Sequence, residues 1–297
     1  MLSLSAAIFV GMQGAGVVMR PDVKLPYRIQ GKGAPILMLA GGPGFTSDYL
    51  RGIIDKVGAD KYRWILLEQR GTPRARLATP SAANLEMRDY VDDLEALRKQ
   101  LKLRKWTVAG QSWGSVLAEA YVAAHPDRVT SLILLNTPGP DLEWLQYGGD
   151  NINRALNAED RKAVADAAAR NRNNPDGMMY ETFVANLPAY VYSRAVAEKN
   201  RGLFKPGCVD GSTINFVFAN LQREKWDVTR ALGRYHGPAL VIQGRQDFLG
   251  ESAAIKAARA MPKGELQFIE RAGHIAWLDN PAPFFSRLSS FLRRNAK

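Results

Sequence analysis

Cysteine and histidine are scarce in this sequence of 297 residues. Cys208 is the single cysteine, so no disulfide can form within the chain and no cysteine-based metal cluster is available. There are only three histidines, His125, His236 and His274, which argues against a polyhistidine metal site. We therefore expect no metal site built from cysteines or from a cluster of histidines.

Long hydrophobic runs are also missing. No stretch reaches the roughly 20 apolar residues that a membrane-spanning helix needs, so we expect no stable membrane insertion. The apolar stretch at residues 2–10 lacks the basic start of a secretory signal. This favours a cytoplasmic protein, whereas a periplasmic or secreted one follows if residues 1–16 are a clipped signal peptide.

Acidic residues are outnumbered by basic ones. The 40 Lys and Arg residues against 29 Asp and Glu residues give a formal net charge of +11. The excess is spread as +6 over residues 1–140, +1 over 141–236 and +4 over 237–297. The densest basic cluster, at residues 98–105, has no interleaved aromatic side chains and fits a solvated helix end. We expect no nucleic-acid partner.

Short apolar runs alternate with helical patterns over most of the chain. This rhythm is typical of strand–helix–strand units and predicts an α/β fold, a mostly parallel sheet with helices on both faces. Strands are expected at residues 17–20, 27–30, 36–40, 64–67, 106–109, 132–135, 240–243 and 267–270. Helices are expected at residues 84–101, 113–124, 251–260 and 281–294, the first of them beginning after Asn84.

Residues 141–236 interrupt this rhythm. They contain helical patterns at about 159–172 and 178–200 and no buried strand. We therefore predict a core made of residues 1–140 and 237–297, with a helical lid (cap) inserted over one edge of its sheet.

The segment Gly110-Gln111-Ser112-Trp113-Gly114 matches the pattern Gly-x-Ser-x-Gly. It follows an apolar strand and precedes a helix, and a sharp turn between two such elements exposes a serine Oγ. Small residues at both ends of the motif permit the close approach that this turn requires. We predict that Ser112 is a nucleophile; the alternative is a glycine-rich turn with an incidental serine.

A serine nucleophile needs a base and an acid that orients the base, in the chain order Ser, Asp, His for this kind of turn. Asp247 follows one predicted strand and His274 follows the next. Because each residue lies just after a strand, both side chains are expected at the sheet edge where Ser112 lies. Ligands of parallel sheets bind at this edge, at the carboxyl ends of the strands. Asp141, which follows an earlier strand, is the rival acid.

The remaining histidines and one further aspartate are weaker candidates. His125 stands at a helix end, where we expect it to cap carbonyl groups. His236 precedes a strand and belongs at the opposite edge of the sheet. Asp279 lies only five residues past His274, and we expect it at the start of the last helix.

The tetrahedral intermediate of acyl transfer needs hydrogen-bond donors for its oxyanion. One is expected to be the backbone N–H of Trp113, the residue after the nucleophile. The other is expected from the glycine-rich loop at residues 40–44, after the third strand. The alternative for this loop is an ordinary tight turn.

Several motifs together carry a family resemblance. They are Gly41-Gly42-Pro43-Gly44, Glu68-Gln69-Arg70-Gly71, the block at residues 92–98, Trp106, the serine motif at 111–115, the segment at 125–129 and Gly273-His274-Ile275-Ala276-Trp277. With them the chain resembles the proline iminopeptidase family of serine aminopeptidases, which has the α/β-hydrolase fold. The resemblance covers about residues 25–140 and 237–290.

This resemblance implies a catalytic triad of Ser112, Asp247 and His274, with oxyanion donors from Gly42 and Trp113. It implies an acyl-enzyme mechanism, no cofactor, and a short peptide or another small molecule as substrate.

Two departures from the family pattern stand out. Ala40 occupies the position of a family histidine, which we expect to alter the support of the oxyanion loop. Glu68 replaces a family aspartate and keeps its charge.

Members of the family hold the free amine of the substrate with lid glutamates. In this chain the candidates are Glu143, Glu159, Glu181 and Glu198, each equally compatible with a solvated helix charge. The acidic share is highest in the predicted lid, which favours an aminopeptidase that releases N-terminal proline or another small residue. The alternatives are a carboxylesterase acting on small esters and a binding protein without turnover.

Overall fold

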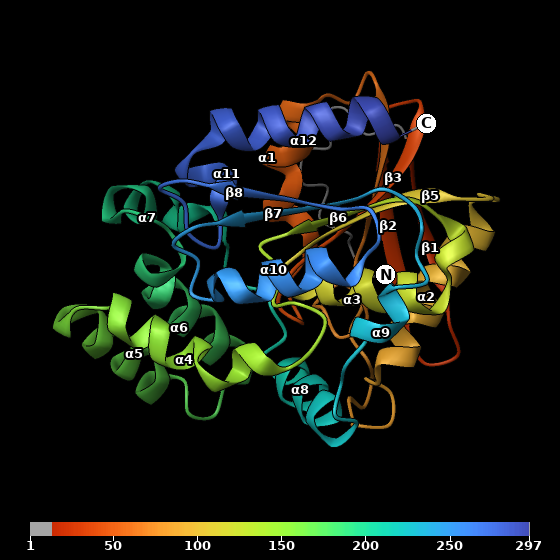
Figure 1. Cartoon of the computed structure of the whole chain (residues 1–297). Helices are drawn as coiled ribbons and strands as arrows, with labels where there is room; N and C mark the ends of the chain where they lie inside the picture. The colour runs from red at the N-terminus through yellow and green to blue at the C-terminus, as the bar shows by residue number, and fades with distance from the viewer. Residues whose placement is uncertain (1–13, 297) are drawn as a thin grey trace.

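Eight strands form one sheet in the order β1-β2-β4-β3-β5-β6-β7-β8 (Figure 1). The computed structural model describes residues 14–296, so the expectation for residues 1–16 falls almost wholly outside it. The strands are β1 (Gly14–Met19), β2 (Lys24–Gln30), β3 (Ala34–Leu39), β4 (Tyr62–Leu67), β5 (Trp106–Gln111), β6 (Val129–Leu135), β7 (Ala239–Gly244) and β8 (Gly264–Ile269). β2 is antiparallel to both of its neighbours, and the other pairs are parallel. The predicted mostly parallel sheet, with all eight of its strands, is confirmed.

Helices cover both faces of this sheet, as predicted. α1 (Arg51–Val57), α11 (Ala276–Asp279) and α12 (Pro281–Asn295) pack on one face, where alternate strand residues such as Ile36 and Ile133 are buried. α2 (Met87–Gln100), α3 (Trp113–Ala124) and α10 (Gly250–Ala260) pack on the other, against residues such as Leu37 and Leu132 (Figure 1). Since both faces are covered, the central strands consist of nearly continuous apolar runs.

The start of α2 differs from the prediction. The helix begins at Met87 and its N-cap is Glu86, not Asn84. Glu86 and Asp89 form a capping box, in which each side chain accepts a hydrogen bond from the backbone of the other. The side chain of Asn84 instead accepts from Ser81 in the preceding turn.

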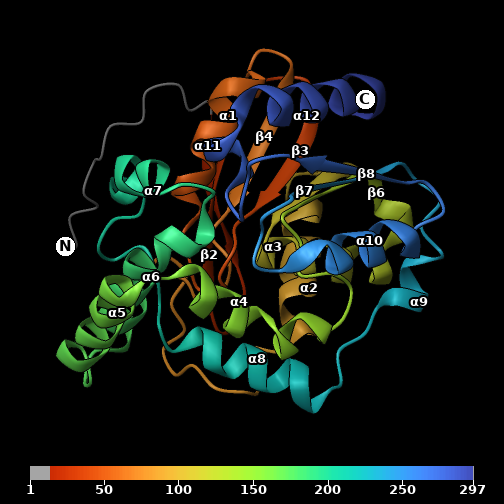
Figure 2. The same ribbon diagram turned by 60° about the vertical axis from the view of Figure 1, so that its left-hand side comes forward.

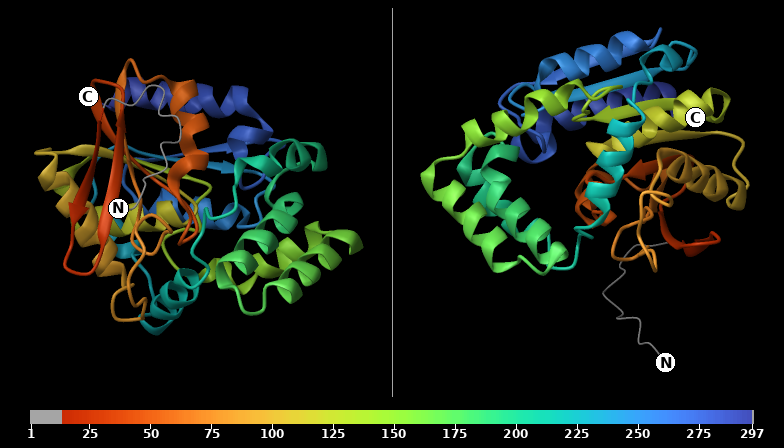
Figure 3. Two further views of the ribbon diagram at one scale, coloured as in Figure 1. Left: turned by 180° about the vertical axis from the view of Figure 1, so that it is seen from behind. Right: turned by 90° about the horizontal axis from the view of Figure 1, so that it is seen from below.

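Residues 141–236, which we call the helical insertion, lie between β6 and β7. In this described segment the regular elements are helical, namely α4 (Gly148–Ala155), α5 (Ala158–Arg170), α6 (Pro175–Tyr190), α7 (Arg194–Asn200), α8 (Thr213–Arg223) and α9 (Thr229–Leu232), with short 3-10 turns. Figure 2 and Figure 3 show α5 and α6 side by side, away from the sheet, while α8 returns toward α2. The predicted single helix at 178–200 is wrong, because extended residues separate α6 from α7.

Within residues 14–296, none of the helices combines the length and the apolar character that crossing a bilayer would require.

Candidate active site

Ser112 lies in the turn between β5 and α3, with φ 54° and ψ −123°. This left-handed conformation is strained for a serine, and the Ser112 amide holds it by donating to the Leu135 carbonyl at 3.0 Å. A Cβ at Gly110 would lie 2.0 Å from the Gly114 carbonyl oxygen, and one at Gly114 would lie 2.3 Å from that of Leu39. The two glycines are therefore needed for the close approach that the sequence motif predicts.

The turn after β7 brings Asp247 against His274. His274 Nδ1 lies 3.0 Å from both carboxylate oxygens of Asp247, and both side chains are buried. Asp247 Oδ2 also accepts from Asn136 at 2.9 Å and from Gln243 at 3.0 Å, and Oδ1 accepts from the Leu249 amide at 3.0 Å. These donors fix the position of the Asp247 carboxylate against His274 Nδ1. A carboxylate acceptor there favours the imidazole tautomer with its proton on Nδ1, which leaves Nε2 free as a base.

Asn136 and Gln243 were missed by the sequence reasoning. Each is a buried polar residue at the carboxyl end of a strand, β6 or β7, directly after a run of apolar residues. An isolated amide at such a position is a usable signal, since buried polar groups need partners.

The rival acid Asp141 lies elsewhere in the site. Its carboxylate forms an ion pair with Lys256, which also binds Glu143 at 2.7 Å. The structure gives Asp141 no hydrogen bond to His274 within the described residues.

The other two histidines lie apart from the site. His125 ends α3 with its ring 5.2 Å from that of Tyr121, and its backbone N–H bonds the Tyr121 carbonyl. We had expected the His125 side chain to cap carbonyl groups, but it forms no such hydrogen bond among residues 14–296. His236 is exposed, ahead of β7.

Asp279 differs from its expected role. It is the last residue of α11, and its carboxylate accepts from the backbone amides of Tyr192 at 2.9 Å and Gly273 at 2.8 Å. Burial raises the pKa of Asp279 to about 6. The residue therefore joins the helical insertion to the loop that carries His274, and does not start the last helix.

The loop at residues 40–44 lies beside Ser112. Gly42 has φ +122°, a conformation that glycine adopts readily, and the Gly42–Pro43 peptide is cis. Gly42 and Trp113 line the same cavity as Ser112 and His274. Within residues 14–296, neither the Gly42 nor the Trp113 amide donates a hydrogen bond to another protein group. Both N–H groups are thus available to an acceptor in the cavity.

Gln69 supports this loop at the position where the sequence departs from the family pattern. Its Nε2 donates to the Ala40 carbonyl at 2.9 Å, and its Oε1 accepts from the Trp113 indole at 2.9 Å. The loop is therefore tied to the serine turn by a glutamine.

The neighbouring Glu68 keeps the charge pairing expected of it. The side chain is buried and accepts hydrogen bonds from the Ser47 hydroxyl at 2.8 Å, Arg74 at 3.0 Å and Arg28 at 3.1 Å.

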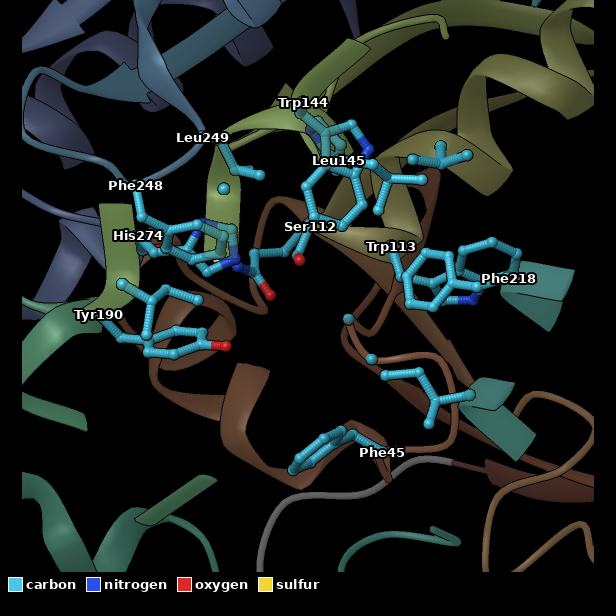
Figure 4. A pocket seen from close by; sticks show the side chains of 18 of the residues that line it. Phe45, Ser112, Trp113, Trp144, Leu145, Tyr190, Phe218, Phe248, Leu249 and His274 are labelled. Carbon is cyan, nitrogen blue, oxygen red and sulfur yellow. Dashed lines mark hydrogen bonds between the residues drawn. The ribbon is translucent and has the colours of Figure 1, made fainter. Parts of the chain in front are cut away.

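Ser112 faces a cavity of about 410 Å³ that is lined largely by apolar side chains from the core and the helical insertion. The insertion contributes Trp144, Leu145, Ile152, Met179, Phe183 and Phe218. Figure 4 shows His274, Tyr190 and Phe248 together on one side of Ser112, with Phe218 on the other side. The ring centroids of Phe248 and His274 are 4.7 Å apart.

The four glutamates considered for amine binding do not line this cavity. Glu143 pairs with Lys256, Glu181 with Arg170 and Glu198 with Arg201, all at the surface, and Glu159 is exposed. Among the described residues that line the cavity, Asp141 alone carries a carboxylate. An amine in the cavity would thus meet a carboxylate that already holds a lysine.

Comparisons with known proteins place the chain by sequence and by fold. Residues 34–281 match the model of the family described as alpha/beta hydrolase fold. The chain is 30% identical over 268 residues to the proline iminopeptidase of Neisseria gonorrhoeae, covering 82% of this chain and 84% of that protein. An alpha/beta fold family hydrolase from Bacillus anthracis superposes with a TM-score of 0.76 at 20% identity, over 95% of this chain and all of that one. A thermophilic esterase from Thermogutta terrifontis superposes with a TM-score of 0.71 at 22% identity, over 96% of this chain and all of that one.

Proposed function

Because the chain belongs to the α/β-hydrolase fold family, close to the proline iminopeptidases, we propose that it is a serine hydrolase with a Ser112–His274–Asp247 triad. Ser112 Oγ attacks the substrate carbonyl while His274 Nε2 takes its proton and then gives it to the leaving group. Asp247 holds the imidazole tautomer through its two 3.0 Å contacts. Water later attacks the acyl-enzyme by the same route.

The oxyanion of each tetrahedral intermediate is stabilised by the amides of Gly42 and Trp113. Their free N–H groups border the cavity at Ser112. Trp113 also begins α3, so the positive end of the helix dipole favours the developing negative charge. The helical insertion acts as a lid, since its side chains supply much of the cavity wall.

The substrate class that the cavity supports best is an uncharged carboxylic ester with apolar groups. The observation that carries this assignment is the apolar lining, in which Asp141 is the sole carboxylate and is paired with Lys256. A buried cation needs a carboxylate partner with which it can pair. An apolar acyl or alcohol group needs only the aromatic and aliphatic walls.

An aminopeptidase that releases N-terminal proline or a small residue is the second candidate. Two observations favour it: the 30% identity to a protein named proline iminopeptidase, and the presence of Asp141 in the cavity wall. In this case the substrate amine would compete with Lys256 for the carboxylate.

A turnover panel separates the two candidates. It pairs aryl esters of four- to eight-carbon fatty acids with a prolyl aryl amide, the latter with a free and with an acetylated N-terminus. We expect hydrolysis of the esters and little hydrolysis of either amide. Rapid cleavage of the free amide, lost on acetylation and weakened in Asp141→Asn, would move the assignment to the aminopeptidase.

Substitution of Ser112 tests the mechanism itself. Ser112→Ala should lower turnover by about 10⁴- to 10⁶-fold and abolish covalent labelling by a fluorophosphonate. Labelling that persists in a folded Ser112→Ala protein would exclude Ser112 as the nucleophile.

A further inference from the structure

Tyr49 is a buried phenol beside the loop at residues 40–44, with 6% of its surface exposed, and it borders the cavity at Ser112. It belongs to a short 3-10 turn before α1. Its hydroxyl accepts from the Gly41 amide at 2.6 Å and lies 2.6 Å from Gln111 Oε1. Gly41 directly precedes Gly42, and Gln111 directly precedes Ser112, so this hydroxyl connects the oxyanion loop with the nucleophile turn.

The direction of these bonds follows from their chemistry. The Gly41 amide can only donate, so the Tyr49 hydroxyl accepts there and gives its own proton to Gln111 Oε1. With Oε1 committed in this way, Gln111 Nε2 donates to the carbonyl of His274 at 3.4 Å. One chain of hydrogen bonds therefore links the backbones of the oxyanion loop and of the His274 loop through the residue before Ser112.

The ring of Tyr49 is held from two sides. Its centroid lies 5.1 Å from that of Phe204 in the helical insertion and 6.3 Å from that of Trp277, with which it stacks. Burial raises the pKa of the phenol well above its usual value, so the hydroxyl is protonated at neutral pH. Both of its hydrogen-bonding functions are used within the protein.

We propose that Tyr49 is a positioning residue that holds the Gly42 amide in register with Ser112, and that it acts on the transition state and not on substrate binding. The proposal rests on the serine-hydrolase function proposed above. Oxyanion donors are effective only within about 2.7–3.1 Å of the oxygen. Ala40 offers no side-chain anchor for this loop, so the Gly41 amide bond to Tyr49 and the Ala40 carbonyl bond to Gln69 hold it.

The test is Tyr49→Phe, which removes the hydroxyl and keeps the ring contacts. We expect kcat to fall about 10- to 100-fold on an ester that Ser112 turns over, with KM nearly unchanged. Inhibition by an apolar trifluoromethyl ketone, which forms a tetrahedral adduct with an oxyanion, should weaken by a similar factor. Inhibition by the matching N-methyl amide, in which an NH–CH₃ group replaces the CF₃ group and which forms no adduct, should stay the same.

Tyr90→Phe is the matched control. Tyr90 is also buried, its ring packs 5.4 Å from that of Trp113, and its hydroxyl has no hydrogen-bond partner among the described residues. This variant should keep the kcat of the wild type. Gln111→Leu removes only the acceptor of the Tyr49 proton and leaves the Gly41–Tyr49 bond. Adding Tyr49→Phe to Gln111→Leu should therefore lower kcat further, but by a smaller factor than it does in the wild type, because the two residues share one of the two bonds.

Several outcomes overturn the proposal. They are an unchanged kcat in a folded Tyr49→Phe protein, equal weakening of the ketone and the amide, or full additivity of the two substitutions. Should Tyr49→Phe fail to fold, an unchanged ketone affinity in Gln111→Leu has the same consequence. Absence of Ser112-dependent turnover in the wild type overturns the proposed function and this inference together, whereas the other outcomes overturn the inference alone.

Discussion

Among single residues, Gly114 leaves no room for a side chain beside Ser112. A Cβ there would lie 2.3 Å from the Leu39 carbonyl oxygen, which is part of the sheet backbone and cannot move aside. We expect Gly114→Ala to lower fluorophosphonate labelling at least 100-fold or to prevent folding, since a 1 Å displacement at a reacting centre costs about that much. Labelling kinetics and circular dichroism measure the two effects.

Gly52→Ala is the control for this substitution. Gly52 lies in α1 with no atom within 4 Å of an added Cβ. Alanine should stabilise the protein there by about 0.5–1 kcal/mol, because glycine loses more backbone entropy in a helix. Normal labelling in Gly114→Ala would contradict the importance of this close approach.

The two candidate acids predict opposite results. Asp247→Asn should lower turnover by about 10⁴-fold by favouring the wrong imidazole tautomer, as the same substitution does in chymotrypsin-type triads. Asp141→Asn should change ester turnover by less than about tenfold, because Asp141 binds Lys256 and not His274. Steady-state kinetics at one pH measures both, and a reversal of the two losses would assign the acid to Asp141.

Glu119 in α3 gives a pH-dependent prediction. It is fully buried, and no basic residue in the described part of the chain pairs with its carboxylate. Burial, and secondarily the charge of Asp141, raise its pKa well above the usual value. Between the unfolded and the folded pKa the native state binds more protons than the unfolded state, so this group's contribution to stability falls as pH rises.

Glu119→Met should therefore stabilise the protein, and more at high pH than at low pH. We expect a gain in the free energy of unfolding of about 1–3 kcal/mol at pH 8 and a smaller gain at pH 5, since an apolar side chain of similar volume removes a carboxyl group that must be protonated in order to be buried. Urea unfolding at both pH values measures the difference. A gain that shrinks as pH rises would contradict the assignment.

Among the elements, the break between α6 and α7 joins the helical insertion to the His274 loop. The Tyr190 carbonyl accepts from the His274 amide at 2.8 Å, and the Tyr192 amide donates to Asp279. This pairing requires extended backbone, and the Ser193 side chain then caps α7 by accepting from the Val196 amide. Helical periodicity alone predicts an unbroken helix because these partners are distant in sequence.

Asp279→Asn tests this connection at pH 8, where the carboxylate of the wild type is ionised. Two backbone N–H groups, from Tyr192 and Gly273, each need an acceptor, and the asparagine side chain has one oxygen. We expect faster hydrogen exchange at one of the two amides and a several-fold lower kcat. Unchanged exchange at both amides would show that Asp279 does not hold the two segments together.

At the scale of the whole molecule, Arg70 connects parts of the chain that are far apart. From the loop after β4 it donates to Asp93 in α2 at 2.6 and 2.8 Å and to Asp22, between β1 and β2, at 3.2 Å. Asp93 also accepts from Arg20 at 2.9 Å. The edge hairpin, the sheet and α2 are therefore linked by one ionic network, in which Arg70 and Asp93 are buried.

Arg70→Met should destabilise the protein by about 3–5 kcal/mol, because it leaves the buried carboxylate of Asp93 without its main partner. In the double variant Arg70→Met/Asp93→Leu we expect much of this loss to be recovered, since both buried charges are then gone. Denaturant unfolding measures both values. A cost below about 1 kcal/mol for the single variant would mean that the pair behaves as a solvated one.

Much of the fold follows from the sequence because its signals are local. Eight short apolar runs predict eight strands, and the glycines around Ser112 predict the turn that the backbone makes there. The order Ser, Asp, His along the chain, with each residue after a predicted strand, pointed to Asp247 and His274. The structure brings these two side chains within 3.0 Å of each other. Hydrophobic periodicity and turn glycines act within a few residues, so they can be read without knowing the tertiary contacts.

Only the tertiary structure decided which polar groups serve the site and which charges face the cavity. Asn136 and Asp247 are 111 residues apart, and Gln111 and His274 are 163 apart. Such contacts depend on the order of the strands in the sheet, which brings the ends of β5, β6, β7 and β8 together. The same reason applies to the glutamates of the helical insertion. Their number is known from the sequence, but only packing determines that three of them pair with surface cations outside an apolar cavity.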